Sequence, residues 1–322
     1  MKFIVTGGAG FVGHNVVRLL EESGHECFII DNLTDYGFVP KDELQYLSNS
    51  RKARIRSNVH HIDLRDYKGI SDFFMAFAGG VDAVIHLASF PRQKVVSANP
   101  IWGSDVMATA LVNLLEQTRL HKIPKFTYIS SSMVYGDFED DVTEDFNCKP
   151  QGQYGIMKLM GEWLVKDYTR RGCFDHVIIR PSAVYGEFDV EDRVVSKFML
   201  AAMRGQTLKV NGAGETLDFT YVEDAAKGIV QATLSPAATN KVYNITKSHS
   251  HSLLDAANMA VKLAGKGTVE CREKDADFPS RGALNIDAAR RDFGFDPKVD
   301  VEEGFQKYHN WFKASPFWKS KI

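Results

Sequence analysis

Between its first apolar run and its first helical pattern, the chain reads Thr6-Gly7-Gly8-Ala9-Gly10-Phe11-Val12-Gly13. Residues 3–6 before this stretch are typical of a buried strand, and residues 14–23 after it have the spacing of an amphipathic helix. Gly7, Gly10 and Gly13 permit a tight turn, a close approach of backbone N–H groups to an anion, and close packing of the helix on the strand. The helix N-terminus adds a partial positive charge. The stretch therefore predicts a site for the pyrophosphate of a dinucleotide.

A carboxylate ends the next apolar run, where a dinucleotide site needs one. Asp31 closes residues 27–31, so it can accept hydrogen bonds from the ribose hydroxyls of adenosine, and its charge repels a 2′-phosphate. Asn32, and not an arginine, follows it. NAD is therefore favoured over NADP as the cofactor. Asp63, at the end of the third apolar run, is placed either to contact the adenine amino group or to cap a turn.

Short β-branched runs alternate with longer helical patterns along the first half of the chain. The apolar runs lie at residues 3–6, 27–31, 59–62, 83–87, 126–130 and 177–180, and long amphipathic patterns lie at residues 104–121 and 156–168. This alternation predicts an α/β fold with a doubly wound parallel sheet of at least six strands. Beyond Pro181 we expect a smaller, partly interleaved α/β domain, with helices at residues 194–204, 252–264 and 301–313 and a strand near residues 208–210.

Composition limits the classes of partner. The 322 residues are 44% hydrophobic and 25% charged, as in compact soluble proteins, and a formal charge of −2 provides no global positive field for nucleic acid or anionic lipid. The chain has no apolar run of about 18 residues and no cleavable leader, so we expect a cytoplasmic protein without a membrane segment. The four dispersed cysteines are expected to be reduced and mostly packing residues, with no disulfide framework. No metal site is expected, because no carboxylate or cysteine falls at ligand spacing from His60, His61, His249 or His251.

Tyr154 and Lys158 are four residues apart at the start of a helical pattern and so share one face of the helix. A phenol, whose pKa is about 10, becomes a useful base at neutral pH only if about 4 kcal/mol stabilises the phenolate. A neighbouring ammonium and the positive nicotinamide ring supply charge of the required sign. The serines at 130–132 follow the fifth apolar run, at the carboxyl edge of the sheet where ligands bind. We expect one serine to hold a substrate alcohol toward Tyr154 and two to satisfy local groups.

An ordered set of motifs spans nearly the whole chain: residues 6–13, Asp31, and residues 86–89, 130–136, 154–158, 180–186 and 218–224. Together they resemble the extended short-chain dehydrogenase/reductase family, in its NAD-dependent epimerase/dehydratase branch. The resemblance implies an enzyme that acts on nucleotide-diphosphate sugars, with an N-terminal Rossmann domain and a C-terminal sugar-nucleotide domain. It implies that Tyr154 is the general base, that Lys158 binds the nicotinamide ribose and lowers the pKa of Tyr154, and that Ser131 binds the reacting hydroxyl.

The resemblance also implies the binding residues. NAD is expected to contact Gly7, Gly10, Phe11, Val12, Gly13, Asp31, Asn32, Asp63, Leu64, Leu87, Ala88, Ser89, Tyr154, Lys158 and Pro181. The substrate is expected to contact Ser131, Ser132, Arg193, Lys197 and Arg281. The two arginines and the lysine of this set either hold the diphosphate or are solvated surface charges. The family often holds the diphosphate with an Asn and an Arg, but this chain has Ala183 and Leu217 at those positions. The expected domains are residues 1–181 with about 219–247 for NAD, and about 182–218 with 248–322 for the nucleotide sugar.

The two residues after Ser131 bear on the reaction. The sugar 4,6-dehydratases of the family carry Asp and Glu where this chain has Ser132 and Met133, while the decarboxylases carry Glu and the 3,5-epimerase/reductases Cys at the Met133 position. A methionine cannot exchange a proton, so these three reactions are disfavoured. A 4-epimerase needs no second acid or base, because the 4-keto sugar turns over in the pocket and takes the hydride back on its other face. We expect a nucleotide-sugar 4-epimerase, with a 4-dehydrogenase or 4-keto reductase as the alternative.

Two further expectations concern the protein as a whole. A non-catalytic NAD-binding protein would have no need of Tyr154 and Lys158, and this class is therefore disfavoured. The helical patterns at residues 104–121 and 154–171 resemble those that pair across a twofold axis in this family. We therefore expect a homodimer.

Overall fold

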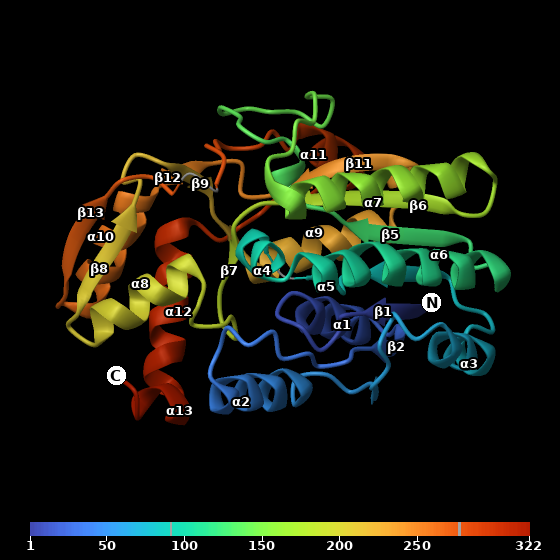
Figure 1. Cartoon of the computed structure of the whole chain (residues 1–322), viewed down its shortest axis with the longest axis horizontal. Helices are drawn as coiled ribbons and strands as arrows, with labels where there is room; N and C mark the ends of the chain where they lie inside the picture. The colour runs from blue at the N-terminus through green and yellow to red at the C-terminus, as the bar shows by residue number, and fades with distance from the viewer. Residues whose placement is uncertain (91, 276–277) are drawn as a thin grey trace.

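A seven-stranded parallel sheet forms the centre of the molecule in the computed structural model, which describes residues 1–90, 92–275 and 278–322 (Figure 1). In spatial order its strands are β11 (Lys241–Ile245), β6 (Asp175–Pro181), β5 (Lys125–Ile129), β4 (Ala83–His86), β1 (Lys2–Thr6), β2 (Glu26–Ile30) and β3 (Val59–His60). Every pairing in this sheet is parallel. The strand order reverses between β1 and β4, which places a ligand crevice at their carboxyl ends. The predicted doubly wound α/β fold is confirmed.

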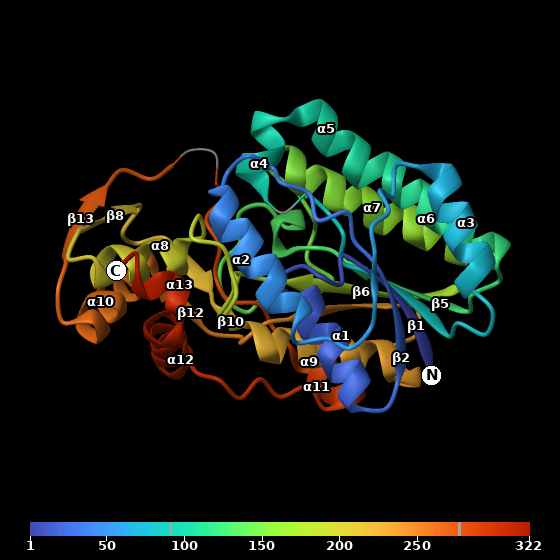
Figure 2. The ribbon, with the colours of Figure 1, turned by 90° about the horizontal axis from the view of Figure 1, so that it is seen from below.

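Helices cover both faces of the sheet (Figure 2). One face carries α1 (Gly13–Glu22), α9 (Val222–Leu234) and α11 (Asp287–Phe293), and the other carries α3 (Tyr67–Phe77), α6 (Ala110–Leu120) and α7 (Gly152–Arg170). In β1, Phe3 and Val5 join one apolar core and Ile4 joins the other, because successive side chains of a strand point to opposite faces. All three are fully buried, as a parallel sheet covered on both sides requires.

One predicted helix is divided in the structure, and one predicted strand ends early. The sequence predicts one helix over residues 104–121, whereas the structure has α5 (Pro100–Ser104), a π-helical turn (Asp105–Thr109) and then α6. A π turn accommodates an extra residue, which amphipathic spacing does not reveal. The strand predicted at residues 59–62 ends at His60, because the N–H of Ile62 bonds back to the carbonyl oxygen of His60 in a turn.

A smaller α/β part lies beside the sheet, at the left of Figure 1. Its expected elements are confirmed as α8 (Val194–Met203), β8 (Thr207–Asn211), α10 (Leu253–Ala264) and α12 (Val301–Ala314). A further strand, β13 (Thr268–Arg272), pairs with β8. Phe198, Phe305, Phe312 and Trp318 belong to the separate apolar core of this part.

The chain passes between the two parts more than once. After α8 and β8, helix α9 and strand β11 return to the large sheet, and α10 lies again in the smaller part. Helix α2 (Lys41–Lys52), which follows β2, extends to α13 (Pro316–Lys319) near the C-terminus (Figures 1 and 2). There the Tyr46 ring stacks on Phe317 at a centroid distance of 4.6 Å, and its hydroxyl bonds to Ser315 at 2.8 Å. This helix therefore links the two parts.

The four cysteines are free. Cys27 packs in the core, Cys148 and Cys173 are partly buried, and Cys271 is exposed on β13, so a packing role is not open to Cys271. Within the three described ranges, no helix has the length and apolar character needed to cross a membrane. The same ranges contain no group of three His, Cys, Asp or Glu side chains arranged to hold a metal ion.

Candidate active site

The glycine-rich turn lies where β1 meets α1, beside the carboxyl end of β4. Gly7 has a φ of +71°, and a Cβ atom there would lie 2.6 Å from the backbone nitrogen of Ala88. A Cβ atom on Gly13 would lie 2.0 Å from the carbonyl oxygen of Gly7. Side chains at these positions would force the strands and the helix apart. Because both are glycines, the first turn of α1 packs close against the sheet.

Asp31 follows β2 at the same edge of the sheet. Its Oδ2 accepts the N–H of Ala9 at 3.0 Å, and its Oδ1 accepts the N–H of Leu33 at 2.9 Å. Burial raises the pKa of Asp31, and these two N–H donors act in the opposite direction. Each carboxylate oxygen has a second lone pair, so the residue can still accept hydrogen bonds from a ribose diol.

Asp63 has a charged partner that the sequence does not indicate. Arg65 donates from Nε to Oδ1 at 2.9 Å and from Nη2 to Oδ2 at 2.6 Å, and Asn32 donates to Oδ2 at 3.2 Å. The hydrogen bonds from Arg65 hold the pKa of Asp63 at about 2. Leu64 beside it is buried. A contact between Asp63 and adenine therefore remains a prediction, in competition with Arg65.

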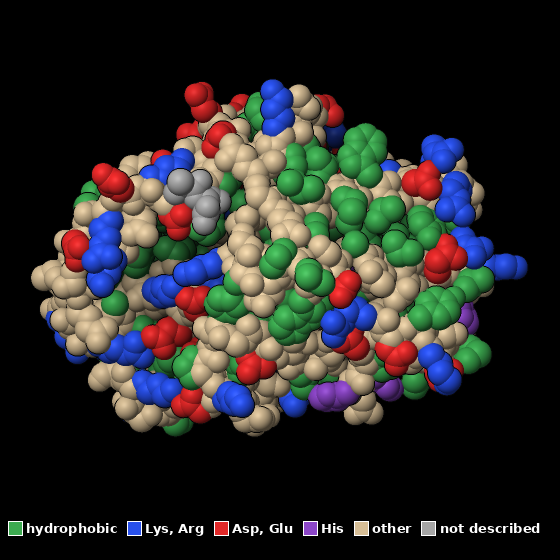
Figure 3. Space-filling view, viewed as in Figure 1, with side chains coloured by type: hydrophobic (Ala, Val, Ile, Leu, Met, Phe, Trp, Pro, Cys, Tyr) green, Lys and Arg blue, Asp and Glu red, His purple; other side chains and the backbone are tan. Residues whose placement is uncertain are grey.

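One cavity, of about 1400 Å³, is lined by all twenty residues that are predicted from the sequence to contact the cofactor or the substrate. Its described lining also contains twelve Lys or Arg residues but only eight Asp or Glu residues. The chain as a whole has a formal charge of −2, so the cations are concentrated here. Figure 3 shows Lys and Arg side chains beside the recess between the two parts of the molecule. Such a cavity favours ligands with several negative charges.

Tyr154 and Lys158 lie in the first two turns of α7, beside the end of β5. The Lys158 Nζ donates to the carbonyl oxygen of Ile129 at 2.8 Å and lies 5.8 Å from the centroid of the Tyr154 ring. The lysine is 4% exposed. It therefore connects the helix that carries the phenol to the strand that precedes the three serines.

Burial is the largest influence on the pKa of both groups. It raises the pKa of the Tyr154 phenol and lowers the pKa of Lys158 to about 7. Arg193, Ser131 and Arg281 lower the pKa of Tyr154 against the effect of burial. The Lys158 Nζ donates to Ile129 and lies 5.8 Å from the centroid of the Tyr154 ring, so a lowering of the pKa of Tyr154 by Lys158 stays a prediction.

The three serines have different partners. Ser130 donates to Glu162 at 2.6 Å, and Ser132 donates to Ser182 at 3.2 Å. The Ser131 Oγ accepts the N–H of Met133 at 3.2 Å. A hydroxyl that accepts still has its proton to donate. Ser131 is the serine whose hydroxyl lowers the pKa of Tyr154. The protons of the other two hydroxyls are donated to Glu162 and Ser182.

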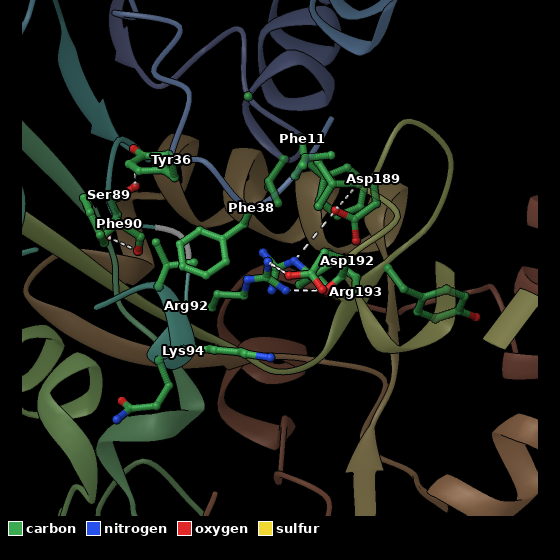
Figure 4. Close-up of a pocket in the computed structure, with 18 of the residues that line it drawn as sticks. Phe11, Tyr36, Phe38, Ser89, Phe90, Arg92, Lys94, Asp189, Asp192 and Arg193 are labelled. Carbon is green, nitrogen blue, oxygen red and sulfur yellow. Dashed lines mark hydrogen bonds and ion pairs between the residues drawn. The ribbon is translucent and has the colours of Figure 1, made fainter. Parts of the chain in front are cut away.

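Charged side chains from both parts of the chain meet across the cavity (Figure 4). Arg92, on the loop after β4, donates to the backbone oxygen and the carboxylate of Asp192. Lys197 pairs with the same carboxylate, and the Arg193 Nε lies 3.8 Å from Asp189. These pairs hold the cations at the cavity wall, where their charge remains close to any bound ligand.

Arg281 differs from the other cations. Burial lowers its pKa to about 10, and its Nε has no hydrogen-bond partner among the described residues. A buried donor without a partner costs about 1–3 kcal/mol. A ligand that accepts this N–H would remove that cost, and the arrangement therefore fits an anion.

The residues of the cavity wall that the sequence does not predict include Arg92, Gln93 and Lys94. They lie on and just before the short helix α4 (Gln93–Ala98). Their position shortly after the motif at residues 86–89, at the carboxyl edge of the sheet, is the one signal that points to them. Local periodicity does not reveal which side chains of so short a helix face a cavity.

A profile of the NAD dependent epimerase/dehydratase family matches residues 3–246. The chain belongs to this family. NAD is therefore its cofactor, and the site fits it. The turn at Gly7 and Gly13 has no room for a Cβ atom, and Asp31 places a carboxylate where a 2′-phosphate would be repelled.

Relatives of this epimerase/dehydratase cover nearly its full length. The uncharacterized UDP-glucose epimerase YtcB of Bacillus subtilis (strain 168) is 29% identical over 313 residues, which is 94% of this chain and 95% of that protein. A putative UDP-glucose 4-epimerase of Methanocaldococcus jannaschii is 29% identical over 319 residues, with coverages of 96% and 98%. The crystal structure of UDP-glucuronic acid 4-epimerase from Bacillus cereus, in complex with UDP-glucuronic acid and NAD, matches with a TM-score of 0.88 and 26% identity, covering 98% of this chain and 99% of that one.

Proposed function

We propose that this family member is a nucleotide-sugar 4-epimerase that acts through a transient ketone at C4. The observation that carries the proposal is the pair of residues after Ser131. Met133 has no proton to exchange, and the Ser132 hydroxyl donates to Ser182 at 3.2 Å. The chain thus lacks the Asp and Glu of the 4,6-dehydratases, and epimerisation at C4 does not need them.

In this proposal Tyr154 exchanges the proton of the C4 hydroxyl. NAD held at this site would supply the acceptor and donor of the C4 hydride. The Tyr154 phenolate takes the hydroxyl proton as the ketone forms and gives it back when the alcohol is restored with opposite configuration. Ser131 donates a hydrogen bond to the C4 oxygen, and Arg193 and Arg281 oppose the rise in pKa that burial imposes on the phenol.

The basic residues of the cavity are proposed to hold the substrate diphosphate. Arg281 offers a buried Nε that has no partner among the described residues, and Arg193 and Lys197 line the same cavity. A guanidinium can bind phosphate oxygens in a bidentate manner. The volume of about 1400 Å³ exceeds the range of roughly 300–1,000 Å³ that is usual for one small ligand, which supports a site for both cofactor and sugar nucleotide.

The two ligands divide the chain between them in this proposal. Residues 1–181 with about 219–247 hold NAD, and about 182–218 with 248–322 hold the nucleotide sugar. The shared core of α9 and β11 with the large sheet supports the first unit. The separate core around α8, α10 and α12 supports the second.

The enzyme is also proposed to be a homodimer. Ile101 on α5, Val112 on α6, and Ile156 and Trp163 on α7 are exposed apolar side chains. Figure 3 shows hydrophobic side chains gathered over α6 and α7. A patch on adjacent helices suits an isologous contact with a second copy of the chain.

The experiment is to incubate the NAD-loaded protein with UDP-, GDP-, CDP- and dTDP-sugars and to follow the products by mass spectrometry and proton NMR. An inverted C4 with unchanged mass supports the epimerase. A loss of two mass units would replace it with a 4-dehydrogenase, and a product that has lost water would contradict the argument from Ser132 and Met133.

A further inference from the structure

The first turn of α7 carries Tyr154, and the N–H groups of a first helical turn have no partner within the helix. A side chain at the N-cap position usually accepts one of them. Here the N-cap residue is Gln151, which makes no such bond and instead donates to Asp137. The N–H groups at the start of the helix therefore depend on acceptors from elsewhere in the chain.

Gln93 supplies an acceptor from a segment 61 residues away. Its Oε1 accepts the N–H of Tyr154 at 3.1 Å. Its Nε2 donates to the Ser97 hydroxyl at 3.2 Å. Because a backbone N–H can only donate, the end of the amide that faces Tyr154 is the oxygen. The Gln93 side chain is 6% exposed, so water competes little for this hydrogen bond.

The neighbouring residues fit this contact closely. Gly152 has a φ of +73°, and a Cβ atom there would lie 2.0 Å from the Gln93 Nε2. Glycine at this position therefore lets the amide reach the helix. Val95 and Val96 of α4 belong to a buried cluster against which Tyr154 packs. Figures 1 and 2 show α4 beside the start of α7. Helix α4 thus contacts both the backbone and the side chain of the tyrosine.

We propose that Gln93 is a positioning residue for Tyr154, an inference that rests on the proposed function of the phenol. By holding the N–H, it fixes the backbone from which the phenol projects. Helix α4 begins four residues after Ser89, which lines the cavity with Leu87 and Ala88 at the end of β4. Gln93 therefore fixes the position of Tyr154 relative to the carboxyl end of β4, where the cofactor binds. A misplacement of about 1 Å can lower a catalytic rate by roughly 100-fold.

The test compares two substitutions at this position. Gln93→Leu removes the acceptor at similar size, and we expect kcat to fall by about 10- to 100-fold with little change in KM or in NAD affinity. Gln93→Glu keeps an acceptor oxygen, and its kcat should stay within about threefold of the wild type. The matched control is Gln153→Leu, which removes a side chain that donates to Pro100 and Ser104 but leaves the Tyr154 N–H bonded. The kcat, KM and NAD affinity of Gln153→Leu should be those of the wild type.

A second readout needs no substrate. Hydrogen exchange of the Tyr154 amide, measured by NMR, should be about tenfold or more faster in Gln93→Leu than in the wild type, Gln93→Glu or Gln153→Leu. Unchanged exchange in Gln93→Leu, or equal loss of kcat in Gln93→Glu, would overturn the proposal. If exchange responds as expected but the wild type turns over no nucleotide sugar, the contact stands and the proposed function fails.

Discussion

Arg180 and Glu162 form a buried, two-pronged ion pair, with Nε 2.9 Å from Oε1 and Nη2 2.7 Å from Oε2. Glu162 is fully buried and also accepts the hydroxyl of Ser130 at 2.6 Å. It lies one helical turn beyond Lys158 and opposes the effect of burial on the pKa of that lysine. The pair therefore joins β6, the end of β5 and the face of α7 that carries Lys158.

Arg180→Met should lower the free energy of unfolding by about 3–5 kcal/mol, because it leaves the Glu162 carboxylate buried without its main partner. Chemical denaturation would measure the change. Lys166→Met is a matched control on the same carboxylate: its Nζ lies 4.0 Å from Glu162 but is 36% exposed. Its cost should be about 1 kcal/mol or less. If both variants lost the same free energy of unfolding, burial of the Arg180–Glu162 pair would not be the cause of the loss.

Tyr154→Phe should keep the fold and the affinity for NAD but lower kcat by about 10²- to 10⁴-fold, the usual contribution of a general base. The phenyl ring can still pack against the cluster around Val95 and Val96, so thermal unfolding should change little. Turnover with the best nucleotide sugar and NAD titration would be measured on the same preparation. Near-normal turnover would remove Tyr154 from its assigned role.

Glu43 offers a test of pH dependence. It is a buried residue of α2 whose Oε1 accepts the N–H of Glu191 at 2.7 Å, and burial raises its pKa from 4.5 to about 7. The Glu43 carboxyl binds its proton more tightly in the folded state than in the unfolded state. The stability that protonated Glu43 contributes is therefore present below about pH 4.5 and is lost as the pH rises through 7. Glu43→Gln keeps an acceptor and cannot ionise.

The free energy of unfolding of Glu43→Gln should therefore exceed that of the wild type at about pH 8, by up to about 3 kcal/mol. The difference should shrink as the pH is lowered to about 5, where the wild-type carboxyl is protonated. Denaturation of both proteins across this range measures it. A difference that does not vary with pH would contradict the raised pKa.

Trp163→Glu should convert the proposed homodimer to a monomer. The Trp163 side chain is 66% exposed on α7, and a charge there would be buried without a partner in a contact between two copies. Sedimentation velocity over a range of concentrations would report the change. Met75→Glu, at a 67% exposed position on α3, is the matched control and should remain dimeric. A monomeric wild type would refute the homodimer.

Much of the site follows from local patterns. The glycine turn and Asp31 stand at the ends of β1 and β2, where parallel strands place ligand-binding residues, and Tyr154 and Lys158 share a face through helical spacing alone. The bond from Gln93 to Tyr154 has no such signal, because the two residues are 61 positions apart. Nor does the sequence show that Arg65 engages Asp63, since their spacing of two residues permits many arrangements.

The sequence by itself determined the doubly wound sheet, the glycine-rich turn and the kinds of chemical group at the strand ends. Strand and helix periods, and the space a Cβ atom needs, are local properties of the chain. Only the tertiary structure decided which charges act on Tyr154 and which pairs, such as Arg92 with Asp192 across 100 residues, close the cavity wall. Hydrogen bonds and charge interactions depend on separations of a few ångströms in space, and these are set by how the two parts of the molecule pack together.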